Sequence, residues 1–165
     1  MKSRKFTLGL FVCYLAALTW IILFKLQFSP GDLPHIRNIN LIPFGASVLV
    51  NGKMDFDEII QNALAFIPLG VFMHALWERK PFLRKALPVA LTSLGFEALQ
   101  FIFAIGASDI TDVISNTSGG MIGIGIALGI AKLFPNHWKA VINVLSLLGA
   151  AALTLLIAVL LLANI

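Results

Sequence analysis

Charged residues are scarce in this sequence. Asp, Glu, Lys and Arg make up 12% of the 165 residues, hydrophobic residues make up 59%, and the mean hydropathy is +0.93. A soluble domain usually carries about 25% charged residues. Because so few charged side chains remain to cover a water-facing surface, we predict a membrane protein. The length allows a single domain over residues 1–165, without a separate soluble domain.

Cysteine and histidine are also rare. Cys13 is the only cysteine, which excludes an intramolecular disulfide and a zinc site built from several thiolates. The three histidines show no metal-ligand spacing, so we expect neither a metal nor a cofactor. The net charge is +4, but the basic residues form short segments between apolar runs. We therefore expect no nucleic-acid partner and interpret the charge as a determinant of membrane orientation.

Five apolar stretches are long enough to span a bilayer, which requires about 20 residues. They predict an all-α transmembrane bundle with spans at Thr7–Leu26, Glu58–Trp77, Ala86–Ile105, Thr111–Phe134 and Ala140–Ala163. The first stretch is too long for a signal peptide and no small-residue cleavage site follows it, so we interpret it as an uncleaved span.

The distribution of basic residues predicts the orientation of these spans. Alternate connecting segments hold nine of the twelve basic residues: Lys2, Arg4, Lys5, Arg79, Lys80, Arg84, Lys85, Lys132 and Lys139. The positive-inside rule places these segments in the cytoplasm. We therefore predict a multi-pass protein of the bacterial plasma membrane, with its N-terminus inside and its C-terminus outside. Residues 27–56 then form an outer segment whose apolar second half lies at the interface or folds back into the bundle.

Glu97 lies near the middle of the third predicted span. An acidic side chain at the centre of a transmembrane helix costs about 2.5–3.5 kcal/mol on insertion scales. Gln100 follows three residues later on the same helical face. The pair is either a functional site or a structural pair that locks helix packing.

A second polar group occurs where the fourth span begins. Asp109 has the position of a helix N-cap, and Asp112 lies in the first helical turn and can share that capping role. Asn116 shares a face with Asp112, and its amide needs a partner inside the bundle. Asn62 occupies the second span, six residues before Pro68, where a kink is expected. The fourth span also has the glycine pairs 119/123 and 125/129, whose spacing allows close helix packing.

Three blocks in this order and spacing resemble the VanZ family of bacterial membrane proteins. They are Asn40-Leu41-Ile42-Pro43-Phe44, the segment Asn62-Ala63-Leu64-Ala65-Phe66-Ile67-Pro68-Leu69-Gly70, and Glu97-Ala98-Leu99-Gln100 followed by Asp109, Asp112, Asn116 and Gly119. The resemblance covers about residues 38–130. Many members have an arginine shortly before the first aspartate, where this chain has Gly106-Ala107-Ser108. We hypothesise that Arg37 supplies this charge.

The resemblance implies an effect on susceptibility to glycopeptide antibiotics of the teicoplanin class. It favours action at the outer membrane face, on access to lipid-linked cell-wall precursors or on the lipid surface, with a lipid-linked precursor or the glycopeptide as the expected partner. The candidate ligand-binding residues are Asn40, Asn62, Glu97, Gln100, Asp109, Asp112 and Asn116.

The alternatives are an intramembrane enzyme or carrier that uses Glu97, with Asp112, as a titrating carboxylate, and a scaffold whose polar residues only lock the bundle. No nucleophile motif or phosphate-binding loop is present, so we favour a binding protein over an enzyme. A carrier of this size is expected to form a homo-oligomer.

Overall fold

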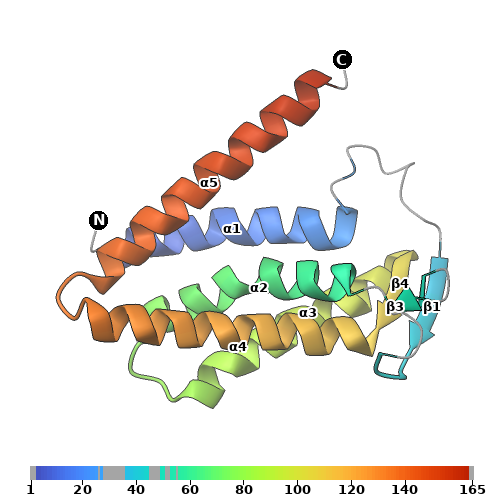
Figure 1. Cartoon of the computed structure of the whole chain (residues 1–165), viewed down its shortest axis with the longest axis horizontal. Helices are drawn as coiled ribbons and strands as arrows, with labels where there is room; N and C mark the ends of the chain where they lie inside the picture. Colours follow the sequence, from blue (N-terminus) through green and yellow to red (C-terminus); the bar gives the residue numbers. More distant parts are fainter. Residues whose placement is uncertain are drawn as a thin grey trace.

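The computed structural model describes residues 3–25, 27, 36–44, 49–50, 53–54 and 56–163. The helices are α1 (Arg4–Phe24), α2 (Asp57–Leu76), α3 (Phe82–Phe103), α4 (Ile110–Leu133) and α5 (Trp138–Ala163). Helices α1 to α4 lie roughly side by side, α5 runs obliquely away from them, and short strands pack against one end of the bundle (Figure 1). All five are long and apolar enough to cross a membrane, which confirms the five predicted spans. The predicted boundaries agree to within four residues.

Local sequence explains where these helices begin and end. Lys25 and Ala104 adopt left-handed backbone conformations (φ 47° and 54°), which terminate α1 and α3. Asp109 caps α4, because its side chain accepts a hydrogen bond of 2.7 Å from the backbone N–H of Thr111. This geometry confirms the expected N-cap.

The strands were not predicted. β1 (Ile36–Asn40) pairs in parallel with β4 (Ile105–Asp109), in a register that places Ile36 beside Ile105 and Asn40 beside Asp109. β2 (Leu49–Val50) and β3 (Lys53–Met54) form a second, antiparallel pair. The pairing of β1 with β4 supplies hydrogen bonds to backbone that would otherwise lie bare at the end of the bundle. Part of the expected outer segment therefore packs as a strand against the connection between α3 and α4.

Helices α2 and α4 approach each other closely through glycines. A Cβ added at Gly119 or Gly123 would overlap the carbonyl oxygen of Ala63 or Ile67, and one at Gly70 would overlap a carbonyl of α4. The 119/123 pair is thus a packing contact, as predicted. The 125/129 pair differs, because a Cβ at either position would meet nothing within 4 Å.

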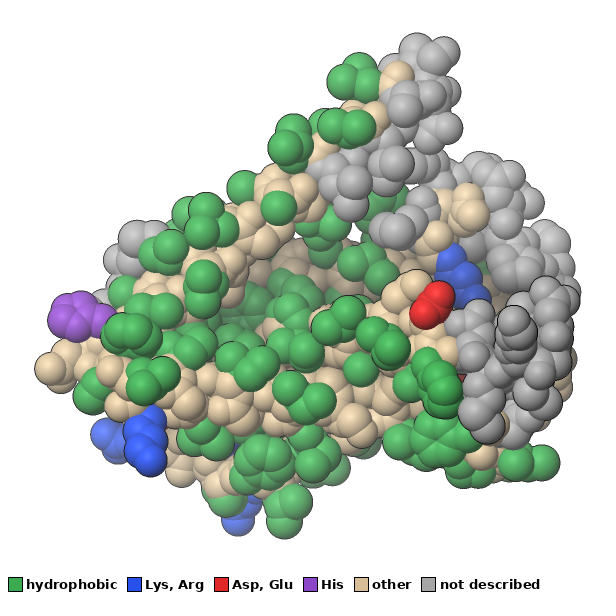
Figure 2. All heavy atoms as spheres, in the orientation of Figure 1, with side chains coloured by type: hydrophobic (Ala, Val, Ile, Leu, Met, Phe, Trp, Pro, Cys, Tyr) green, Lys and Arg blue, Asp and Glu red, His purple; other side chains and the backbone are tan. Residues whose placement is uncertain are grey.

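Charged side chains gather at the two ends of the molecule, while hydrophobic side chains cover the visible length of the helices (Figure 2). We call the end that carries β1 and β4 the strand end. The opposite end carries the α2–α3 and α4–α5 connections (residues 77–81 and 134–137), and we call it the basic end. Arg84 and Lys85 were predicted in the connecting segment, but both lie in the first turn of α3, because this helix begins directly after Pro81. Lys85 is the buried one of the two. Its buried Nζ donates to the carbonyl of Glu78 (2.9 Å) and lies 3.0 Å from Nδ1 of His74.

Candidate functional site

A polar cavity of about 220 Å³ lies at the strand end of the bundle. The last residues of α1 and α3 and the first turns of α2 and α4 surround it, because these four helix ends meet there. It is lined by Ile21, Ile22, Lys25, Glu58, Gln61, Asn62, Ala65, Glu97, Gln100, Ala107, Asp112 and Asn116. Five of the seven candidate ligand-binding residues are therefore brought to one cavity.

Glu97 is held in this cavity by the strand that follows its own helix. Its Oε2 accepts a hydrogen bond of 2.9 Å from the backbone N–H of Asp109, and only 6% of the residue is exposed. The hydroxyl of Ser108 donates to the backbone carbonyl of Glu97 over 2.7 Å. β4 thus folds back on α3 and gives a buried carboxyl group one directed backbone donor.

Asp112 joins two helices across the cavity. Its Oδ1 accepts a hydrogen bond of 2.8 Å from Nδ2 of Asn62, so α4 is tied to α2. Lys25 and Glu58 lie nearer the solvent, with about half of each side chain exposed and 4.0 Å between their charged atoms. This exposed pair leaves the cavity open to charged or polar groups from outside the bundle.

Two buried amides, those of Gln100 and Asn116, belong to residues that line the cavity. Gln100 donates from Nε2 to the carbonyl of Ile22 (3.1 Å), and Asn116 donates from Nδ2 to Oγ of Ser93 (2.9 Å). The residues are 5% and 0% exposed. Within the part of the chain that the structure describes, their side-chain oxygens Oε1 and Oδ1 have no hydrogen-bond partner. A buried acceptor without a donor costs about 1–3 kcal/mol of folding free energy. A bound group that donates a hydrogen bond to these oxygens would remove that cost.

The remaining two candidates lie beside the cavity and do not line it. Nδ2 of Asn40 donates to Oδ2 of Asp109 over 2.9 Å, while the other carboxylate oxygen of Asp109 caps α4. These bonds fix β1 and the start of α4 to the strand whose backbone holds Glu97. In this geometry Asn40 and Asp109 are positioning residues.

Three polar cavity residues were missed in the sequence analysis: Lys25, Glu58 and Gln61. Lys25 ends an otherwise apolar span, which is itself a signal of a polar site. Glu58 and Gln61 share a helical face with Asn62 and Ala65 by their spacing of three and four residues. Both signals were present in the sequence, but neither shows which helix ends meet.

Arg37 has a different role from the one hypothesised. Its Nε and Nη2 donate to the carbonyls of Phe101 and Ile102 (3.2 and 3.1 Å), and its guanidinium lies 5.5 Å from the ring centre of Phe101. The residue therefore caps the C-terminal end of α3. No cluster of three or more metal-ligating side chains occurs among the described residues. His35 lies outside them.

Comparisons with known proteins confirm the resemblance to the VanZ family. Residues 11–134 match the model of the family described as VanZ/LLP1. The chain is 40% identical over 151 residues to "Protein VanZ" of Enterococcus faecium, an alignment that covers 90% of this chain and 89% of that protein. No solved structure matches the chain.

Proposed function

Because this chain belongs to the VanZ/LLP1 family, we propose that it lowers bacterial susceptibility to glycopeptide antibiotics of the teicoplanin class. In this proposal it acts at the outer face of the plasma membrane, on the access of the antibiotic to lipid-linked cell-wall precursors. It does so by binding a membrane-surface component through the polar cavity.

The observation that carries this proposal is the pair of unpartnered acceptors on Gln100 and Asn116. Both are buried, and both line a cavity at a helix-bundle end, where polar groups of membrane lipids are found. Buried oxygens without a partner among the described residues also occur away from the cavity, as in Thr117, so the position of this pair at the cavity wall is what matters. Asn62 and Asp112 of the same cavity bond to each other. The unsatisfied pair therefore favours a binding role.

The orientation follows from the charges. Arg79, Lys80 and Arg84 lie at or near the connection between α2 and α3, and Lys132 and Lys139 flank the connection between α4 and α5. The positive-inside rule favours a cytoplasmic position for this basic end, which supports the proposal that the polar cavity faces outward. A component of the outer leaflet reaches it there without crossing the membrane.

The alternative is an intramembrane enzyme or carrier for a lipid-linked substrate. The observation in its favour is that two carboxyl groups, those of Glu97 and Asp112, line the same cavity. In that reading Glu97 exchanges a proton during turnover or transport. A binding role needs only the hydrogen-bonding capacity of Glu97.

An antibiotic-protection assay separates these readings. Variants are expressed in a glycopeptide-susceptible bacterium, and the inhibitory concentration of teicoplanin is measured beside the yield of folded protein. Asn116→Leu removes a cavity acceptor and is expected to abolish protection at normal yield. Thr117→Val is the matched control, because Oγ1 of Thr117 is also buried without a partner among the described residues but does not line the cavity.

Glu97→Gln tests ionisation. Gln retains size and an acceptor oxygen, so a binding role predicts that protection is kept. Loss of protection at normal yield would instead support the titrating enzyme or carrier. Full protection by Asn116→Leu would contradict a binding role for the cavity.

A further inference from the structure

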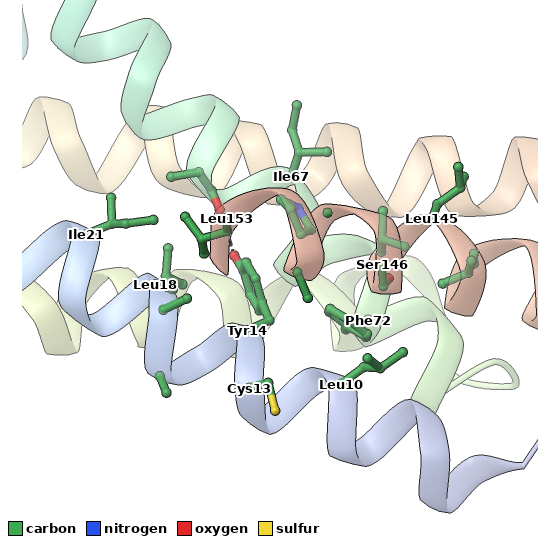
Figure 3. A pocket seen from close by; sticks show the side chains of 18 of the residues that line it. Leu10, Cys13, Tyr14, Leu18, Ile21, Ile67, Phe72, Leu145, Ser146 and Leu153 are labelled. Carbon is green, nitrogen blue, oxygen red and sulfur yellow. Dashed lines mark hydrogen bonds between the residues drawn. The ribbon is translucent and has the colours of Figure 1, made fainter. Parts of the chain in front are cut away.

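A second, larger cavity lies along the bundle between α1, α2, α4 and α5. Its volume is about 700 Å³, within the range of about 300–1,000 Å³ typical of ligand pockets. Figure 3 shows side chains of α1, α2 and α5 that line it, including Leu18, Ile67 and Leu153. We call it the apolar cavity.

The apolar cavity offers few free hydrogen-bonding groups. The hydroxyl of Tyr14 donates to the carbonyl of Ala65 over 2.7 Å, and that of Thr154 donates to the carbonyl of Ala150 over 2.8 Å. These two hydroxyls are thus satisfied by backbone acceptors, and the indole N–H of Trp20 donates to the carbonyl of Gln27 (3.0 Å), which leaves Ser146 as a further hydroxyl in the wall. Its walls suit a hydrocarbon better than a polar ligand.

The cavity arises from the course of α5. The first turns of α5 are packed, with Trp138 and Ile142 buried against α2 and α4. The helix then diverges from α1 towards its C-terminal end (Figure 1), and the space-filling view is hollowed between them (Figure 2). Both helices are long and apolar enough to cross a membrane, so an opening between them along their length would face hydrocarbon.

The apolar and polar cavities adjoin each other. Ile21 of α1 and Ala65 of α2 line both. A single molecule could therefore place an apolar chain in the apolar cavity and a polar group in the polar cavity, and it would lie against these two shared side chains where the cavities meet.

The hydrogen-bonding groups of the polar cavity favour one kind of head group. Among the described residues, three carboxyl groups line it, those of Glu58, Glu97 and Asp112, together with one cationic side chain, that of Lys25. The amides of Gln61, Asn62, Gln100 and Asn116 carry both donors and acceptors, so the carboxyl groups set the balance. A phosphate head group would meet this excess of carboxyl groups, whereas an amine or hydroxyl head group can donate to them.

We propose that the ligand is a single-chain amphiphile, with its hydrocarbon chain in the apolar cavity and an amine- or hydroxyl-bearing head in the polar cavity. This inference deepens the proposed function and rests on it for the polar cavity being a ligand site. Transfer of a chain from lipid to an apolar cavity gains little free energy, because both are apolar. The head-group bonds therefore provide the selectivity, and the chain sets the position from which the head reaches them.

Photolabelling of the full chain in phosphatidylcholine nanodiscs tests the proposal. The probe is a twelve-carbon primary amine with a diazirine near the end of its chain. Saturable labelling is expected on the cavity walls, within residues 10–21 of α1 and 142–157 of α5. Dodecylamine and dodecyl maltoside are expected to displace the probe at about tenfold lower concentration than dodecyl phosphate, a ratio that corresponds to about 1.4 kcal/mol.

Gly149→Phe blocks the apolar cavity. Gly149 lines it, and an added Cβ would meet no atom within 4 Å, so the ring enters open space. Labelling is expected to fall by about fivefold or more, since the chain and the ring cannot share the space. Gly129→Phe is the matched control, because its Cβ is equally unobstructed and it lines neither cavity.

Labelling spread evenly over lipid-facing helices and unchanged by Gly149→Phe would overturn the proposal, as would equal displacement by all three head groups. The proposed function can be contradicted independently of the amphiphile site. Saturable labelling that Gly149→Phe removes, in a chain that gives no antibiotic protection, would support the amphiphile site and contradict the proposed function.

Discussion

The carboxylate of Glu97 accepts a hydrogen bond of 2.9 Å from the backbone N–H of Asp109, twelve residues later in the chain. This bond joins the last part of α3 to the strand that leads into α4. Asp109 in turn caps α4 and accepts from Asn40 of β1. The position of the buried carboxyl group is therefore tied to the strand pair at the strand end of the bundle.

Two replacements of Glu97 separate the contribution of this hydrogen bond to stability from that of the carboxyl charge. Glu97→Leu leaves the N–H of Asp109 without its acceptor, which costs about 1–3 kcal/mol of folding free energy. Glu97→Gln keeps an acceptor oxygen and is expected to lose less. Thermal unfolding of the purified variants in detergent measures both effects. Equal melting temperatures for the two variants would show that the bond contributes nothing to stability.

The helices were predictable from the sequence because hydropathy over about 20 residues is a strong signal. The strand pair was not. Ile105 was assigned to the end of the third span, and Ile105–Asp109 shows no strict alternation of apolar and polar residues. Its partner Ile36–Asn40 lies more than sixty residues earlier, and no local pattern encodes a parallel pairing at that separation.

The cavity was predictable in part. The spacing of Glu97 with Gln100, and of Asp112 with Asn116, places each pair on one helical face. That these faces meet Asn62 depends on the packing of α2 against α4. Lys25 joins them only because α1 ends at this level, in a left-handed residue whose conformation the sequence does not specify.

The glycines of α4 are expected to differ sharply in their tolerance of a methyl group. Gly123→Ala places a Cβ against the carbonyl of Ile67 and forces α2 and α4 apart, at a cost of about 1–3 kcal/mol or more. Gly125→Ala meets nothing within 4 Å and is expected to gain up to about 1 kcal/mol from helix propensity. The folded fraction after detergent extraction, followed by thermal unfolding, measures both. Similar destabilisation by the two variants would contradict the close approach at Gly123.

An ion pair at the basic end predicts a pH dependence. Nζ of Lys139 donates to Oε2 of Glu78 over 2.8 Å, and this bond holds the pKa of Glu78 below its ordinary value of 4.5. The lowered pKa means that the pair stabilises the fold above pH 4.5, and that this contribution is lost as the pH falls through the folded pKa. Because both side chains are partly exposed, the effect is about 0.2–1 kcal/mol.

Glu78→Gln measures this contribution. The variant is expected to melt at a lower temperature than the parent at pH 7, with the difference shrinking towards pH 3. Lys139→Met removes the other partner and is expected to show the same pH dependence. A difference that stays constant between pH 7 and pH 3 would exclude the ion pair as its cause.

The orientation of the bundle decides whether the polar cavity is accessible from outside the cell. Single cysteines in a Cys13→Ala background test it with a membrane-impermeant maleimide on intact cells. Leu41→Cys lies at the strand end, where Leu41 is 73% exposed, and Lys80→Cys lies in the exposed connection at the basic end. Because the basic residues cluster at the basic end, we expect Leu41→Cys to react in intact cells and Lys80→Cys only after permeabilisation.

The reverse pattern would place the cavity on the cytoplasmic side, and a site facing the cytoplasm does not meet an antibiotic that acts outside the membrane. The proposed function at the outer face would then fail, while the hydrogen-bonded geometry of Glu97 and Asp109 would be unaffected.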